Sequence, residues 1–334
     1  MSNNNAIFTI CAKNYLAQAL TLKGSVQKHN PDTDFFIFLA DENTNQFGDL
    51  NVIELNESWI PNWKSMAFKY NVIEFSTSIK PFCFDKLFKN GYEKVIYLDP
   101  DVYVTDNLYF IFENLDKYAI VITPHYNHIE AVYTGSVPEE ELLFVGIYNL
   151  GFGAIKNNDI GNQVVAWWKN RLENKCYADK EDAYHVDQRW IDFIPGFFPN
   201  DVLITHHAGI NIAIWNLHER VLSMGNGRYI ISDMRNGKDY PLLFFHFSGF
   251  DPYNTKVVNR RHPRFNIDVF PTLEPLIKEY AELVYRNNYD MFSKLKYAFN
   301  SFHNGYVIMP FHRRLYRKHI EHNNACSDPF RHKR

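Results

Sequence analysis

Short apolar runs alternate with stretches of helical periodicity along the first part of the chain. Residues 6–12 and 35–39 are apolar runs of strand length, and residues 14–29 between them carry apolar side chains at helical spacing. A strand, a helix and a second strand in this order predict a parallel β-α-β unit. The N-terminal region therefore indicates an α/β fold with a mostly parallel sheet.

The same alternation continues through most of the chain. Residues 66–90 have helical character with a break at Lys80-Pro81, because a proline disfavours helical geometry in the preceding residue. The remaining apolar patterns predict strands at 94–98, 118–122, 142–146 and 242–245, and helices at 160–173 and 272–298. We expect one catalytic domain over residues 1–265 and a helical, basic extension over residues 266–334.

Two aspartates follow the strand predicted at residues 94–98. In open α/β sheets ligands bind at the carboxyl ends of the strands, and Asp99 and Asp101 come directly after such an end. Two carboxylates one residue apart can share a hard divalent cation, which prefers oxygen ligands. Aspartates at strand ends also cap turns, so the triplet alone leaves a structural role open.

The surrounding sequence resembles glycosyltransferase family 8, which includes glycogenin and the bacterial lipooligosaccharide galactosyltransferases. The resemblance lies in Lys86-Leu87 followed by residues 94–108, which read KVIYLDPDVYVTDNL. It implies a GT-A fold, a Rossmann-like mixed sheet flanked by helices. It further implies that Asp99 and Asp101 bind manganese and the diphosphate of a UDP-sugar, and that Lys86 supports the phosphates or the donor sugar.

Two other segments match this family near the ends of predicted strands. Residues 9–25 resemble the strand and helix that cradle the nucleoside, which places Ala12, Asn14 and Tyr15 near the base. Residues 148–153 resemble the family's Asn-x-Gly segment, in which Asn149 faces the donor sugar. A tyrosine at a helix start and an Asn-x-Gly turn are also common without a ligand.

The last two matching motifs concern the reacting centre and the metal. Asp187-Gln188 resembles the pair beside the reacting carbon, with a solvated helical charge as the structural alternative. His246 and Gly249 resemble the family's His-x-x-Gly motif, in which the imidazole is the third protein ligand to the metal. An isolated histidine after an apolar strand would more often be an ordinary core residue.

The sequence departs from the family after Gly249. The family continues with Lys-Pro-Trp, whereas residues 250–253 read Phe-Asp-Pro-Tyr, so the phosphate-binding lysine is missing. We expect Lys256, Arg260 or Arg261 to replace it. Outside the family pattern, residues 213–220 contain Trp215, Asn216 and His218, which could form an acceptor wall or simply pack in the core.

Composition narrows the class of protein. The 334 residues are 46% hydrophobic and 22% charged, as in a globular protein with a sizeable core. The 28 Phe and 21 Tyr mildly favour carbohydrate binding, because sugars stack their apolar faces on aromatic rings. A net charge of -3 argues against a nucleic-acid partner. The four cysteines are scattered and include no C-x-x-C pair. The pattern also shows no signal peptide and no membrane span, and together these features predict a cytoplasmic location.

The C-terminal residues 311–334 combine seven Lys or Arg side chains with interspersed apolar residues. As an amphipathic segment this stretch would bring the enzyme to anionic lipid as a peripheral membrane protein, where a lipid-linked glycan acceptor resides. The alternative is a solvated tail or an oligomer contact.

Together these features predict a metal-dependent glycosyltransferase. With Mn²⁺ or Mg²⁺, it would move a hexose from a UDP-sugar donor to a glycan acceptor, in bacterial surface glycan assembly such as lipopolysaccharide synthesis. The family resemblance implies that the transfer retains the anomeric configuration. A nucleotidyltransferase is a second possibility, but residues 11–16 lack the Gly-rich loop that holds a triphosphate. A non-catalytic sugar- or nucleotide-binding relic of the fold is a third.

Overall fold

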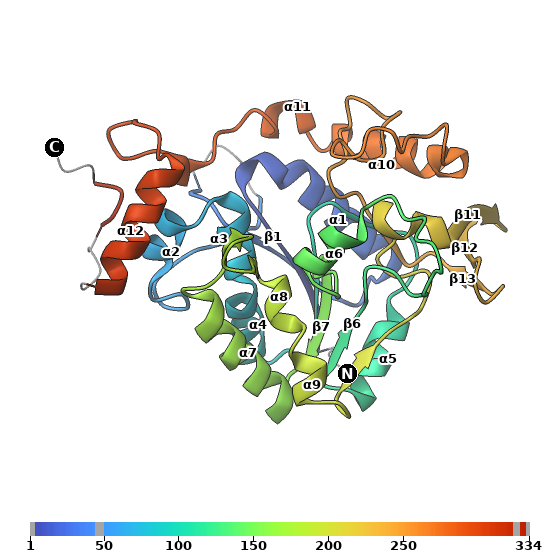
Figure 1. Ribbon diagram of the computed structural model, residues 1–334, viewed down its shortest axis with the longest axis horizontal. Coiled ribbons are helices and arrows are strands. Elements are labelled where there is room, and N and C mark those ends of the chain that lie inside the picture. Colours follow the sequence, from blue (N-terminus) through green and yellow to red (C-terminus); the bar gives the residue numbers. More distant parts are fainter. Residues whose placement is uncertain (1–3, 44–49, 323–327, 332–334) are drawn as a thin grey trace.

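A seven-stranded mixed sheet forms the centre of the molecule (Figure 1), and the computed structural model describes residues 4–43, 50–322 and 328–331. Its order is β10-β6-β7-β4-β1-β2-β3. The strands are β1 (Asn5–Cys11), β2 (Asp34–Leu39), β3 (Ile53–Glu54), β4 (Lys94–Leu98), β6 (Ile120–Ile122), β7 (Phe152–Lys156) and β10 (Val202–Ile204). Only β7 runs antiparallel to its neighbours in this sheet, which confirms the predicted mixed, mostly parallel arrangement.

Helices cover both faces of this sheet. Alternate residues of β1 point to opposite faces, as a strand requires: Phe8 packs in the cluster shared with α4 and α7, whereas Ile7 packs in the cluster shared with α1 and α5. The longer of these helices are α1 (Leu16–His29), α4 (Lys80–Lys89), α5 (Tyr109–Lys117) and α7 (Asp159–Leu172). Shorter ones are η1 (Lys13–Tyr15), α2 (Trp63–Lys69), α3 (Val72–Ser78), α6 (Glu139–Val145), α8 (Gln188–Ile191), α9 (Ile194–Phe197) and η2 (Ile214–Glu219).

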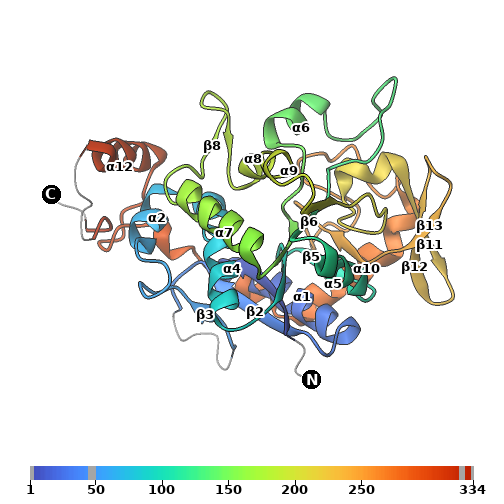
Figure 2. The same ribbon diagram turned by 90° about the horizontal axis from the view of Figure 1, so that it is seen from below.

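Smaller strands extend the fold away from the main sheet. β5 (Val102–Val104) pairs antiparallel with β14 (Phe244–His246), and β8 (Ala178–Asp179) pairs with β9 (Tyr184–His185). β11 (Arg220–Gly225), β12 (Arg228–Asp233) and β13 (Asp239–Pro241) form a three-stranded sheet at one end of the molecule in both views (Figures 1 and 2).

Three predicted segments differ from the structure. Residues 142–146 were predicted as a strand, but residues 142–145 belong to helix α6 and Gly146 caps its C-terminal end. A run of four apolar residues suits either element, and the three glutamates of the first turn favour a helix because they complement its positive N-terminal end. The stretch 66–90 forms three helices, with Asn71 capping the second, and the predicted helix 272–298 is interrupted at Asn288, which has a φ of +63°.

The C-terminal part packs against the rest of the chain. It consists of η3 (Pro271–Leu273), α10 (Glu274–Arg286), α11 (Tyr289–Phe292), η4 (Ala298–Asn300) and α12 (Pro310–His322). Leu276 and Tyr280 of α10 share a hydrophobic cluster with Leu16 of α1, and α12 lies beside α2 in both views (Figures 1 and 2). The helical tail is therefore confirmed, while a domain boundary at residue 265 stays a prediction.

Some basic residues of the C-terminal tail pack against the rest of the protein and are therefore not available to contact a membrane. Arg313 is buried, and Arg317 lies with its guanidinium 3.8 Å from the centroid of the Tyr177 ring. Arg314 and Lys318 are exposed, and Lys333 and Arg334 lie outside the described residues. Within the described ranges, no helix is both long enough and apolar enough to cross a bilayer.

Candidate active site

Two strand pairings bring Asp99, Asp101 and His246 together. β4 pairs with β7 and ends at Leu98, and the backbone N–H of Asp99 donates to the carbonyl oxygen of Gly151 at 2.8 Å. β14 pairs with β5 so that His246 lies opposite Val102, and the N–H of Phe247 donates to the Asp101 carbonyl at 2.9 Å. Segments almost 150 residues apart in sequence thus meet at one sheet edge.

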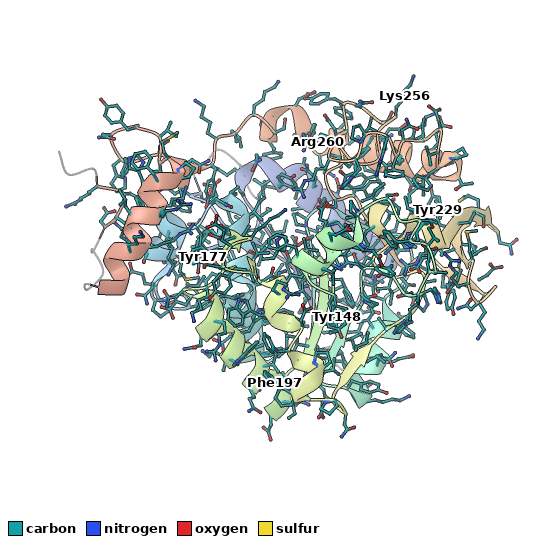
Figure 3. The ribbon with its side chains drawn as sticks, in the orientation of Figure 1. Tyr148, Tyr177, Phe197, Tyr229, Lys256 and Arg260 are labelled. Carbon is teal, nitrogen blue, oxygen red and sulfur yellow. The ribbon has the colours of Figure 1, made fainter. Side chains whose placement is uncertain are left out.

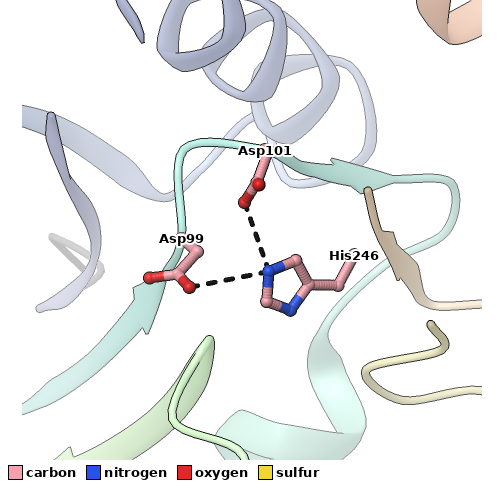
Figure 4. A group of neighbouring side chains, drawn as sticks. All are labelled: Asp99, Asp101 and His246. Carbon is pink, nitrogen blue, oxygen red and sulfur yellow. Dashed lines mark ion pairs between the residues drawn. The ribbon is translucent and has the colours of Figure 1, made fainter. Parts of the chain in front are cut away.

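The three side chains point toward a common centre (Figure 4). His246 Nε2 lies 3.5 Å from Asp99 Oδ2 and 3.2 Å from Asp101 Oδ1, and one ligand atom from each residue lies within 4.8 Å of the others. Burial acts to lower the pKa of His246, but the Asp101 and Asp99 carboxylates outweigh it and the pKa is raised. Two carboxylates and one imidazole fit a divalent cation that accepts oxygen and nitrogen ligands.

Gly151 makes the approach of the imidazole possible. A Cβ atom on Gly151 would lie 2.2 Å from Cε1 of His246, a distance that no side chain could tolerate. Gly151 therefore leaves room for the imidazole of His246 beside Asp99 and Asp101.

A buried network fixes the ring of His246. Asn211 Oδ1 lies 3.3 Å from His246 Nδ1, and Asn211 Nδ2 donates to Asn149 Oδ1 at 3.0 Å. Asn149 Oδ1 also accepts from the Gly151 N–H, and its Nδ2 lies 3.3 Å from His125 Nε2. Burial lowers the pKa of His125 to about 4, so this ring is neutral at neutral pH.

A buried ion pair lies beside the cluster. Lys80 Nζ is 2.5 Å from Asp187 Oδ2, donates to the Leu150 carbonyl at 2.9 Å, and lies 4.1 Å from the centroid of the Tyr97 ring. Burial raises the pKa of Asp187, although Lys80 opposes this shift. The Tyr97 hydroxyl in turn donates to Asp99. Tyr97 and Lys80 thereby connect Asp187 to the cluster of Asp99, Asp101 and His246.

The cluster opens into a cavity of about 630 Å³. It is lined by ten of the eleven residues that the family motifs place in the site: Ala12, Asn14, Tyr15, Asp99, Asp101, Asn149, Asp187, Gln188, His246 and Gly249. The exception is Lys86, whose ammonium lies 5.6 Å over the Trp59 ring, outside this lining. Lys80, which begins the same helix, lines the cavity, while the role of Lys86 at the phosphates or the donor sugar stays a prediction.

Two of the three basic residues proposed after Gly249 reach the cavity. Arg260 and Arg261 line it. Lys256 is exposed, lies outside the lining and projects from the upper edge of the molecule in Figure 3. Gly249 has a φ of +67°, and its carbonyl accepts from the Arg260 N–H at 3.0 Å, which holds this loop at the cavity.

The amide of Gln188 is used entirely by the backbone. Its Oε1 accepts from the Leu150 N–H at 3.0 Å, and its Nε2 donates to the Val145 carbonyl at 2.7 Å. Gln188 thus ties the end of α6 to the segment before β7. In the predicted acceptor wall only Trp215 lines the cavity, since Asn216 bonds to backbone groups and His218 packs against Tyr126 and Tyr133.

Sequence reasoning missed Lys80, Asn211 and His125. Lys80 was noted only as a helix break, and a basic residue at a helix start resembles a solvated one. Asn211 has a φ of +53°, within a loop that the sequence does not distinguish from an ordinary turn. Their roles depend on contacts with distant segments, which no local pattern reports.

The chain resembles solved structures of several glycosyltransferases. They include galactosyltransferase LgtC in complex with donor and acceptor sugar analogues, at 18% identity and a TM-score of 0.46 over 83% of this chain and 99% of that one. Glycosyltransferase GlyE of Streptococcus pneumoniae TIGR4 matches at 16% identity and a TM-score of 0.46, over 89% of this chain and 66% of that one.

Two curated proteins are similar in sequence, and no family model matches the chain. The uncharacterized protein YfnF of Bacillus subtilis (strain 168) is 26% identical over 283 residues, which cover 82% of this chain and 91% of YfnF. The uncharacterized protein YfnD of the same strain is 22% identical over 263 residues, covering 75% of this chain and 79% of YfnD.

Proposed function

We propose that this protein is a metal-dependent glycosyltransferase that moves a hexose from a UDP-sugar to a hydroxyl group of a glycan acceptor. The observation that carries the proposal is the convergence of Asp99, Asp101 and His246 at the edge of one large cavity. A mixed carboxylate and imidazole site beside a basic loop suits a cation bound to a diphosphate.

Different residues of the cavity would bind different parts of the UDP-sugar donor. Asp99, Asp101 and His246 would hold Mn²⁺ or Mg²⁺, and such a cation, when bound, offsets the charge that grows on a diphosphate leaving group. Arg260 and Arg261 supply positive charge for the phosphate oxygens in place of the missing lysine. Ala12, Asn14 and Tyr15, from the end of β1 and η1, would contact the nucleoside.

The remaining polar groups would act at the sugar. Asp187, Gln188 and Asn149 position and stabilise the sugar as positive charge develops at the anomeric carbon, which an acceptor hydroxyl attacks with retention of configuration. Lys80 holds Asp187 in place through their buried ion pair and opposes the rise in the Asp187 pKa that burial causes. Gln188 contributes mainly by fixing Leu150, because both ends of its amide are already bonded to backbone groups.

The acceptor is proposed to be a bacterial surface glycan assembled at the cytoplasmic face of a membrane. Exposed Phe311 and Leu315, together with exposed Arg314 and Lys318, give α12 an outer side suited to peripheral contact with anionic lipid. A lipid-linked acceptor would be presented at such a surface.

The test is release of UDP from UDP-glucose, UDP-galactose and their N-acetyl forms, with and without manganese. We expect manganese-dependent turnover of one donor, lost by at least 100-fold in Asp101→Ala and His246→Ala, and retained in the matched surface variant Lys256→Ala. Binding of a donor without turnover, even with acceptors added, would favour a binding relic. Turnover of nucleoside triphosphates instead would favour a nucleotidyltransferase.

A further inference from the structure

Trp215 presents an unused hydrogen-bond donor to the cavity. Its side chain lines the cavity and is 7% exposed, yet its indole Nε1 finds no acceptor among the described residues. Trp168 and Trp190 each donate to a backbone carbonyl, at 3.3 Å and 3.0 Å. A buried indole N–H usually has a partner, so one left unpaired at a ligand cavity points to a ligand atom as that partner.

The position of Trp215 is fixed by its neighbours. Asn216 Oδ1 accepts from the Ala213 N–H, and its Nδ2 donates to the carbonyls of His125 and Asn211, so the start of η2 is held rigidly. The Trp215 ring packs edge-on against His246, with centroids 5.2 Å apart. This donor is therefore preorganised directly beside the metal cluster.

A second polar atom in the same cavity is also unpaired. His185 Nδ1 is buried without a partner in the described part of the chain, and its ring packs edge-on against Phe144. Two unsatisfied ring nitrogens in one cavity favour a polar, oxygen-rich ligand.

We propose that Trp215 is a donor-recognition residue whose indole N–H donates to an oxygen of the nucleotide-sugar. The inference rests on the proposed glycosyltransferase function. The oxygens of such a donor that approach the cluster of Asp99, Asp101 and His246 belong to the diphosphate or to the hydroxyls of the adjoining sugar, and Trp215 is placed to bind either kind.

The experiment is isothermal titration calorimetry with UDP, UDP-glucose and UDP-galactose in the presence of manganese. Trp215→Phe keeps an aromatic ring and removes the N–H, and we expect it to weaken binding about 3- to 10-fold. A loss seen with a UDP-sugar but not with UDP identifies a sugar hydroxyl, and an equal loss with UDP identifies a diphosphate oxygen. The control Trp190→Phe removes an N–H that bonds outside the cavity and should leave all three affinities within about twofold.

Manganese binding without nucleotide should be unchanged in Trp215→Phe. This result would show that the variant loses a hydrogen bond to the nucleotide-sugar and does not displace His246. Trp215→His restores a ring N–H and should recover part of the affinity, and it also serves if the phenylalanine variant does not fold. Wild-type affinity of Trp215→Phe for all three ligands would overturn the inference and leave the proposed function intact. If the wild type binds none of them, the proposed function fails, and the inference with it.

Discussion

The Nδ1 atom of His246 donates a hydrogen bond to Oδ1 of Asn211, 3.3 Å away. The direction follows from the amide of Asn211, because its Nδ2 donates to Asn149 and leaves Oδ1 toward the imidazole. In the neutral ring Nε2 of His246 would then carry the lone pair, on the side that faces Asp99 and Asp101. Asn211 is thus a positioning residue for the candidate metal site.

Replacing Asn211 should weaken metal binding without touching a ligand. We expect Asn211→Ala to lower manganese affinity about 10- to 100-fold, because the imidazole loses the partner that fixes its tautomer and orientation. Asn211→Asp keeps an acceptor for Nδ1 and should lose less. Electron paramagnetic resonance titration of manganese, without nucleotide, measures both, and equal affinities of Asn211→Ala and the wild type would contradict this role.

The ion pair of Lys80 and Asp187 should be important for stability as well as for the site. Lys80→Met leaves a buried, unpaired carboxylate and should lower the free energy of unfolding by about 3–5 kcal/mol. Adding Asp187→Asn to it should restore part of this loss. Urea denaturation measures the effect, with Lys86→Met as the control, which should cost about 1 kcal/mol or less because Lys86 only lies over Trp59. Equal losses in the two single lysine variants would argue against a special role for Lys80.

Arg260 and Arg261 should contribute to nucleotide binding. Each arginine that bonds a phosphate oxygen adds a charge-assisted hydrogen bond, so we expect either alanine variant to weaken UDP binding about tenfold in the presence of manganese. Lys256→Ala, from the same loop but outside the cavity, is the control and should bind UDP as the wild type does. If all three variants bind alike, the loop does not replace the missing lysine.

Arg313 should hold helix α12 in place. Its guanidinium donates to the carbonyl oxygens of Ala67, Phe68, Tyr70 and Phe299. Arg313→Met would leave these buried carbonyls unpaired and should cost about 2–4 kcal/mol of unfolding free energy. Limited proteolysis should then cut the chain near α12 sooner, whereas exposed Arg314→Met should behave as the wild type.

Stability should fall on mild acidification because of buried neutral histidines. Burial lowers the pKa of His207 to about 4, and its Nδ1 accepts from the Gly209 N–H. In the unfolded chain this histidine has a pKa of about 6.5, so it binds a proton at a higher pH than in the folded protein. Its contribution to stability is therefore complete above that pH and is lost as the pH falls toward 4.

His207→Asn keeps an acceptor for the Gly209 N–H and removes the titration. Between pH 7 and pH 5 the wild type should lose about 1–2 kcal/mol more than this variant in urea denaturation. Burial lowers the pKa of His125 and of His185 to about 4 as well, so a smaller pH dependence should remain in the variant. Identical pH profiles of the two proteins would contradict the assignment to His207.

The sequence by itself determined the framework of the sheet and the place of its chemistry. Apolar runs fixed the strands at 6–12, 35–39 and 94–98 because buried parallel strands need continuous apolar residues. The position of Asp99 and Asp101 after such a run located the candidate site, since a strand's carboxyl end opens onto the ligand-binding edge. The apolar runs and the aspartates that follow a strand are local features of the sequence, so they can be recognised without the structure.

Only the tertiary structure decided which side chains meet there. Lys80 and Lys86 both lie on α4, but six residues turn a helix by about 240°, so packing alone determines which one faces Asp187. The apolar run at 142–146 suits a strand or a helix until its neighbours bury one side of it. Asn211 and Trp215 reach His246 because their segments pack beside β14, and a local sequence pattern records neither that neighbour nor the unpaired indole N–H.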